Sequence, residues 1–80
     1  MVTVRFFAGA RSAAGTAEEK VQAAATLDEL VGVLTAAHGP ALGKILSVAS
    51  FLVDEVVCHD RQAALPEGAS VDVLPPFAGG

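Results

Sequence analysis

The sequence predicts a small domain of the α+β class, with a mixed sheet of four to five strands and one long helix packed across it. Two observations carry this prediction. Short apolar or alternating runs near both ends and after the midpoint are typical of strands, and one bounded segment between them has helical periodicity. At 80 residues the chain has room for a single domain.

The first strand is predicted over residues 2–8, where side chains alternate between two faces. One face carries Val2, Val4, Phe6 and Ala8, and the other carries Thr3, Arg5 and Phe7. Phe7 is a large ring on the polar face, so either a later segment covers it or it belongs to a docking surface. Residues 9–15 form a turn region with room for one helical turn. Residues 17–24 are a weaker second strand, antiparallel to the first.

The long helix is predicted to begin at Thr26, because Thr26 and Glu29 fit a capping box. The residues that follow place one apolar stripe along the helix, and its members are Leu27, Leu30, Val31, Leu34 and His38. Gly39 and Pro40 end the helix, since glycine suits a left-handed cap and proline cannot continue the hydrogen bonding.

The second half is predicted to complete the sheet. Residues 40–49 fit either a short helix or loose turns, and residues 50–59 fit a strand, a tight turn at Asp54-Glu55 and a short strand. A turn over residues 65–68 precedes the last strand, residues 70–74. The first and last strands are both strongly apolar, which suits parallel neighbours at the centre of the sheet. This order predicts a β-grasp (ubiquitin-like) fold.

Composition excludes several classes of function. The net charge is −4, with five basic and nine acidic residues, so we expect neither nucleic acid nor a membrane surface as a partner. No apolar run approaches the roughly 20 residues that cross a bilayer, and the first residues do not resemble a secretory signal. A cytoplasmic protein is expected. Cys58 is the single cysteine, which predicts a small buried side chain and no cysteine-based metal site.

The last residues are the most informative segment: Pro75, Pro76, Phe77, Ala78, Gly79 and Gly80. Two prolines favour an extended path, and two glycines without Cβ atoms let the backbone enter a narrow slot. We therefore predict a folded domain over residues 1–76 and a flexible tail over residues 77–80 that presents the Gly80 carboxylate. A frayed terminus without a role is the alternative.

Few other residues suggest chemistry. Arg5 and Arg11 are scarce positive charges that can pair with acidic groups, so with Phe7 and Phe77 they form the predicted partner-docking set. No ligand or catalytic role is expected for His38, which lies on or beside the apolar stripe near the end of the helix, and His59 is expected in a solvated turn. No motif predicts a bound metal or a permanently bound cofactor.

Several segments together are typical of one family: Val4-Arg5-Phe6-Phe7-Ala8, then Arg11, Gly15, Leu65 and Gly68, and above all the ending from Leu74 to Gly80. On these residues the chain resembles the MoaD/ThiS family of sulfur carriers, specifically the small subunit of molybdopterin synthase. The resemblance covers nearly the whole chain. Many members have Val-Asn where this chain has Val53-Asp54, which leaves the geometry of that turn open.

The resemblance implies a cycle of activation and sulfur transfer. An E1-like enzyme would adenylate the Gly80 carboxylate with ATP, and sulfur would then replace AMP to give a C-terminal thiocarboxylate. The tail would enter the large synthase subunit, in a heterotetramer, and donate sulfur to a cyclic pterin phosphate. Delivery of sulfur to thiazole or amino-acid synthesis, or use as a ubiquitin-like protein modifier, are the alternatives.

Overall fold

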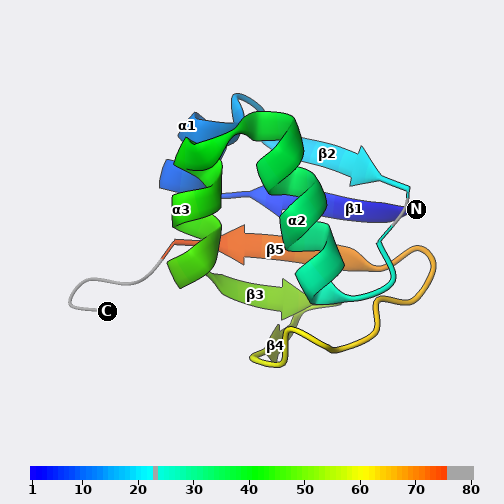
Figure 1. Ribbon diagram of the computed structural model, residues 1–80. Helices are drawn as coiled ribbons and strands as arrows, with labels where there is room; N and C mark the ends of the chain where they lie inside the picture. Colours follow the sequence, from blue (N-terminus) through cyan, green and yellow to red (C-terminus); the bar gives the residue numbers. More distant parts are fainter. Residues whose placement is uncertain (23, 76–80) are drawn as a thin grey trace.

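The computed structural model describes residues 1–22 and 24–75 (Figure 1). Its elements follow one another in the order β1 (Val2–Phe6), α1 (Gly9–Ala14), β2 (Glu18–Val21), α2 (Leu27–His38), α3 (Pro40–Val48), β3 (Ser50–Val53), β4 (Val56–Cys58) and β5 (Ser70–Leu74). The predicted domain boundary at residue 76 lies just beyond this part of the chain.

The strands of the described residues form one mixed sheet in the order β2-β1-β5-β3-β4. β1 and β5 are parallel, with Val4 beside Val71, and the other neighbouring pairs are antiparallel. The first and last strands therefore lie side by side at the centre, as the sequence predicts. The α+β class and the β-grasp fold are confirmed.

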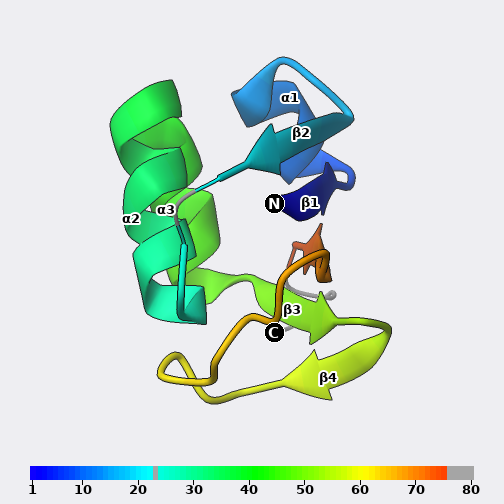
Figure 2. The ribbon, with the colours of Figure 1, turned by 90° about the vertical axis from the view of Figure 1, so that its right-hand side faces the viewer.

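Two helices, rather than the single long helix expected, cover one face of the sheet (Figure 2). Residues 40–48 form α3, which packs beside the twelve-residue α2. Helix α3 forms because Leu42 and Leu46, four residues apart, are both fully buried in the core. Within the described residues, no helix is long and apolar enough to cross a bilayer.

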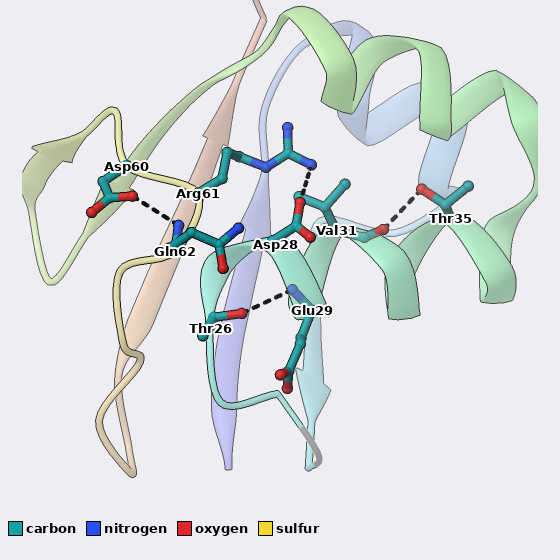
Figure 3. Close-up of polar contacts among 8 residues, drawn as sticks. All are labelled: Thr26, Asp28, Glu29, Val31, Thr35, Asp60, Arg61 and Gln62. Atoms are coloured by element: carbon teal, nitrogen blue, oxygen red, sulfur yellow. Dashed lines mark hydrogen bonds and ion pairs between the residues drawn. The ribbon is translucent and has the colours of Figure 1, made fainter.

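The predicted capping box is present at the start of α2 (Figure 3). The backbone N–H of Glu29 donates to the Thr26 hydroxyl at 3.2 Å. The Glu29 carboxylate in turn accepts from the backbone N–H of Ala25 at 3.0 Å, one residue earlier than the usual reciprocal partner. Asp28 and Glu29 both lie in the first turn, where the helix dipole favours negative charge.

A loop from the other half of the chain completes this cap. The N–H of Leu27 donates to the C=O of Ala63, and the N–H of Asp28 donates to the C=O of Arg61 at 2.7 Å. The Arg61 guanidinium also donates to the Asp28 carboxylate at 2.9 Å (Figure 3). Helix N-termini leave N–H groups without intrahelical partners, so α2 depends on residues 61–63 for its first turn.

Both strands of the first hairpin are shorter than predicted. β1 ends at Phe6 rather than at Ala8, because Ala8 has φ 51° and ψ −123° and turns the chain into α1. β2 ends at Val21 rather than at residue 24, since Val21 pairs with Val2, the first residue of β1. Met1, the residue before Val2, is not part of β1.

The predicted tight turn between β3 and β4 is confirmed, although both of its central residues have unusual backbone angles. Asp54 has φ 49° and Glu55 has φ 69°, values typical of a two-residue type I′ hairpin turn. The N–H of Ser70 donates to the Asp54 carboxylate at 2.9 Å, and the N–H of Asp54 donates to the C=O of Ser70 at 2.7 Å. These bonds tie the turn to the start of β5.

Gly43 on α3 lies close against Thr35 of α2, so we predict that Gly43→Ala destabilises the protein. A Cβ at this position would meet the Thr35 methyl carbon at 2.8 Å, and the Thr35 hydroxyl is held by the C=O of Val31 at 2.8 Å. Overpacking of this kind costs about 1–3 kcal/mol, which exceeds the roughly 1 kcal/mol that alanine gains in a helix. Urea unfolding at equilibrium would measure the change.

Thr35→Ser provides the control, because it removes the methyl group and keeps a hydroxyl for Val31. Gly43→Ala in the Thr35→Ser background should be neutral or stabilising. Equal losses in both backgrounds would show that the two side chains are not in conflict.

Candidate functional site

The predicted tail begins where β1 and β5 end together. Because these central strands are parallel, their C-terminal ends meet at one end of the sheet, next to α1 (Figure 1). The N–H of Phe7 donates to the C=O of Val73 at 3.2 Å, and β5 ends one residue later, at Leu74. Pro75 follows and is half-buried. Phe7 therefore lies beside the point at which the chain leaves the sheet.

The other residues of the predicted presentation segment lie outside the described residues: Pro76, Phe77, Ala78, Gly79 and Gly80. Their assigned roles stay predictions. The site can be built from the residues that surround the start of this segment.

A concave pocket of about 290 Å³ lies beside Phe7, between the end of β1, α1 and the start of β2. We call it the Phe7 pocket, and its lining residues are Arg5, Phe6, Phe7, Ala8, Arg11, Ala17 and Glu18. The Phe7 residue is 40% exposed, so no described segment covers it in full. Three of the four predicted docking residues, Arg5, Phe7 and Arg11, thus line one pocket, and the fourth, Phe77, lies outside the described residues.

Arg5 is held by a two-pronged ion pair with Asp72 on the neighbouring strand. Arg5 Nε donates to Asp72 Oδ1 at 2.7 Å, and Nη2 donates to Oδ2 at 3.0 Å. The hydrogen bond and the charge of Asp72 raise the pKa of the Arg5 guanidinium above its ordinary value. The Asp72 side chain is only 10% exposed, whereas the Arg5 side chain is 43% exposed. The carboxylate of this ion pair is therefore buried in the sheet, whereas the guanidinium side is accessible to solvent.

This pair occupies the middle of the sheet face opposite α2 and α3. Register places five residues in one row across that face: Glu18, Arg5, Asp72, Leu52 and Val57. Val57 is 56% exposed. The open face therefore has a charged half next to the Phe7 pocket and an apolar half on β3 and β4. An exposed apolar area of this kind is typical of a protein-binding surface.

Arg11, on α1, lines the same pocket as Arg5 and is exposed. Within the described residues, its guanidinium makes no ion pair or side-chain hydrogen bond.

Three residues of this region were not predicted from the sequence as parts of the site. Asp72 and Glu18 flank Arg5, and the alternation pattern already placed Asp72 on the face opposite Val71 and Val73. The pairing register was the missing information. Ala8 was assigned to a strand, because alanine carries no signal for a positive φ.

The remaining candidates have structural contacts. His38 Nε2 lies 2.5 Å from Glu19 Oε1, and its ring packs edge-on against Phe6 at 6.0 Å. Cys58 is half-buried, with Sγ 3.5 Å from the C=O of Asp60. His59 is exposed in the following loop. Within residues 1–22 and 24–75, no three metal-ligating side chains cluster.

The structure is a ubiquitin-like β-grasp domain, and its C-terminal segment follows directly after a central strand. The chain belongs to the ThiS family, whose model matches residues 4–80. None of the curated proteins with which the sequence was compared matches it.

Solved structures of three proteins illustrate the similarity. Subunits 1 and 2 of molybdopterin-converting factor from Helicobacter pylori form a complex, and the similar chain is 25% identical with a TM-score of 0.74, covering 99% of this chain and 97% of that one. Small archaeal modifier protein 1 from Methanosarcina acetivorans is 23% identical with a TM-score of 0.86, over 99% and 95% of the two chains. The BexX/CysO complex of Amycolatopsis orientalis contains a chain 19% identical with a TM-score of 0.78, over all of both chains.

These similarities place the chain among folds used by sulfur carriers and ubiquitin-like modifiers. Two of the three neighbours are complexes with a second protein.

Ala8 carries backbone strain next to Phe7, so we predict that Ala8→Gly stabilises the protein. A residue with a Cβ pays of order 1–3 kcal/mol in such a sparsely populated conformation, and glycine adopts it without strain. We expect a net gain of about 1 kcal/mol after the entropy that glycine loses on folding. Thermal and urea unfolding would measure it.

Ala13→Gly, five residues on in α1, is the control and should lose about 1 kcal/mol, because its backbone is helical. A loss at both positions would contradict the strain at Ala8.

Proposed function

We propose that this protein is the sulfur carrier of molybdopterin synthesis, the small subunit of a molybdopterin synthase. The observation that carries the proposal is the point at which the C-terminal segment begins. It follows β5 at the centre of the sheet, beside the exposed Phe7 and its pocket. The similarity to a chain of the H. pylori complex of molybdopterin-converting factor subunits supports this destination.

In the proposed cycle, the Gly80 carboxylate is the reacting group. An E1-like partner adenylates it with ATP, because a carboxylate is a poor electrophile and AMP is a good leaving group. A sulfur donor then displaces AMP and leaves a thiocarboxylate. This soft nucleophile is ionised at neutral pH, so it needs no neighbouring base. The chain binds no cofactor permanently in this scheme, and the cycle takes place in the cytoplasm.

The folded domain holds the tail in position for its partner. Ordering the last residues in a partner's slot costs roughly 1–2 kcal/mol for each residue in backbone entropy, most for Gly79 and Gly80. Main-chain hydrogen bonds from the partner and burial of Phe77, about 2 kcal/mol, would offset this. Phe7, Arg5 and Arg11 would add a second, preformed contact at the base of the tail.

The large synthase subunit is the proposed partner, in a heterotetramer. The apolar half of the open face, at Leu52 and Val57, extends the contact area beyond the Phe7 pocket. A tail alone is a short ligand, and a surface that docks beside it raises its effective concentration at the partner's active site.

Use as a protein modifier is the second candidate, favoured by the TM-score of 0.86 to the M. acetivorans small archaeal modifier protein. The two functions use the same activated Gly80 and differ in the group that receives it. A modifier forms an isopeptide bond with a lysine, whereas a sulfur carrier returns with its own carboxylate.

Deletion of Gly80, or Gly79→Leu, should abolish sulfur loading while the thermal midpoint stays within about 2 °C of the unaltered protein, because both residues follow the folded domain predicted over residues 1–76. Intact mass spectrometry of protein from its native cells would detect the replacement of one oxygen by sulfur. Ala36→Leu is the matched control, since Ala36 is exposed on α2, far along the chain from the tail.

A large drop in the thermal midpoint of the Gly79→Leu protein would make the tail structural and contradict the proposal. Isopeptide-linked ladders on the unaltered protein, without the sulfur-containing form, would favour the modifier instead.

A further inference from the structure

We propose that two copies of this chain associate through β4, which pairs with β4 of the second copy, antiparallel and centred on Val57. The two sheets would then form one continuous sheet. Strand β3 separates β4 from β5, so the pairing leaves the start of the C-terminal segment accessible. The proposal goes beyond sulfur transfer and does not depend on it.

β4 is an edge strand, and its outer side has no partner among the described residues. It ends the strand order, and Figure 2 shows it at the lower edge of the sheet. The N–H of Asp54 donates to the C=O of Ser70 on β5, so alternation along β3 turns the backbone groups of Val53 toward β4. Val53 pairs with Val56, and the next residue, Val57, therefore directs its N–H and C=O outward.

The two edges of the sheet differ in their protection against pairing. β2, at the other edge, carries Glu18, Glu19 and Lys20, and charges on an edge strand oppose association with another edge. β4 has no charge within its three residues, and its Val56 and Val57 are 68% and 56% exposed. An uncharged edge with exposed β-branched side chains favours pairing with another strand.

The free backbone groups select the register. Because the same two groups of Val57 face outward in each copy, the two Val57 residues can exchange a pair of N–H···O=C bonds when the strands run antiparallel. Every residue of β4 then has a cross-strand partner, with Val56 opposite Cys58 of the second copy. Contact between these side chains covers apolar surface that is exposed in the single chain.

The same register brings complementary side chains together on either side of β4. Glu55 would lie opposite His59 of the second copy, and two-fold symmetry forms this contact twice. Both side chains are exposed, and neither makes an ion pair or side-chain hydrogen bond within the described residues. A histidine N–H can donate to a carboxylate whether or not the ring is charged.

The next pair outward, Asp54 and Asp60, has like charges that would oppose the pairing. Each of these carboxylates already accepts a backbone N–H of its own chain, from Ser70 and Gln62 respectively. The chain also leaves the edge after Asp60, since residues 61–63 cap α2. The favourable pairing is therefore confined to residues 55–59.

Pairing of this kind would widen the apolar half of the open face. Leu52 and Val57 are cross-strand neighbours on that face, so the apolar halves of the two copies would lie side by side. β5 and its counterpart would run in opposite directions, and the two C-terminal segments would begin at opposite ends of the joined sheet.

Sedimentation velocity of the full chain tests the association, with a reductant present to keep Cys58 as a thiol. A three-residue strand gives a small interface, so we expect a weak dimer that appears as the concentration rises from about 10 µM to about 1 mM. Val57→Lys places like charges opposite each other and should weaken the dimer at least about tenfold. Val48→Lys, at a valine 60% exposed on α3, is the matched control and should change it by less than about twofold.

Exchange of charges tests the register. His59→Glu would face Glu55 with a second carboxylate and should weaken the dimer about fivefold, counting both symmetric contacts. Adding Glu55→Lys to this variant should restore the affinity to within about twofold of the unaltered chain. Backbone amide spectra would verify that each variant keeps the fold. The Val57 amide should exchange with solvent more slowly at about 1 mM than at about 0.1 mM protein.

A chain that stays monomeric at every concentration, or a Val57 amide whose exchange is independent of concentration, would overturn the proposal. A dimer that survives Val57→Lys and is lost with Val48→Lys would instead place the contact on the helices, which also contradicts pairing through β4. No recovery with the exchanged charges would contradict the register. Sulfur loading of Gly80 is measured separately, so loading in a strictly monomeric chain would refute the self-association alone.

Discussion

The structure depends on the parallel pairing of β1 with β5 at the centre of the sheet. This pairing brings residues almost a whole chain apart into contact, with Val4 beside Val71 and Phe6 beside Val73. All four side chains are at most 2% exposed. The pairing determines where the C-terminal segment leaves the body and places Phe7 next to that exit. The candidate site is thus a direct result of topology rather than of a dedicated loop.

The same pairing explains why an ion pair lies on the open face of the sheet, opposite α2 and α3. Arg5 and Asp72 are opposite each other on the two central strands, so a carboxylate that is nearly inaccessible to water has a guanidinium within reach. Burying Asp72 alone would be unfavourable, and the bidentate geometry compensates for the loss of hydration. This one ion pair therefore supplies hydrogen bonds to the Asp72 carboxylate in the middle of the sheet. It also orients Arg5, which lines the neighbouring pocket.

Much of the fold could be predicted from local signals. Helix α2 carries a capping residue, an apolar stripe and a glycine-proline stop, and these agree with one another, so its limits were predictable. The central position of β1 and β5 followed from their apolar composition. The choice between a helix and loose turns for residues 40–49 required tertiary contact, because the burial of Leu42 and Leu46 against α2 and the sheet decides it.

The site was predictable only in part. Alternation placed Arg5, Phe7 and Asp72 away from the core, but their proximity depends on a register that spans the whole chain. The length of β2 is set by where β1 begins, not by the composition of β2 itself. Ala8 has no sequence signal for its backbone angles, and the pocket beside it could not be foreseen.

Because residues 61–63 cap helix α2, the first half of the chain cannot complete its secondary structure without the second half. The first N–H groups of α2 donate to carbonyl groups of a loop that precedes β5, and β1 pairs with β5 at the centre of the sheet. Because these contacts join segments far apart in the sequence, the first turn of α2 and the centre of the sheet are completed only when the two ends of the chain come together, and such non-local pairing slows folding. A partner that contacts the Arg5–Asp72 pair, by contrast with one that contacts only the first hairpin, recognises the two ends of the chain after they have come together.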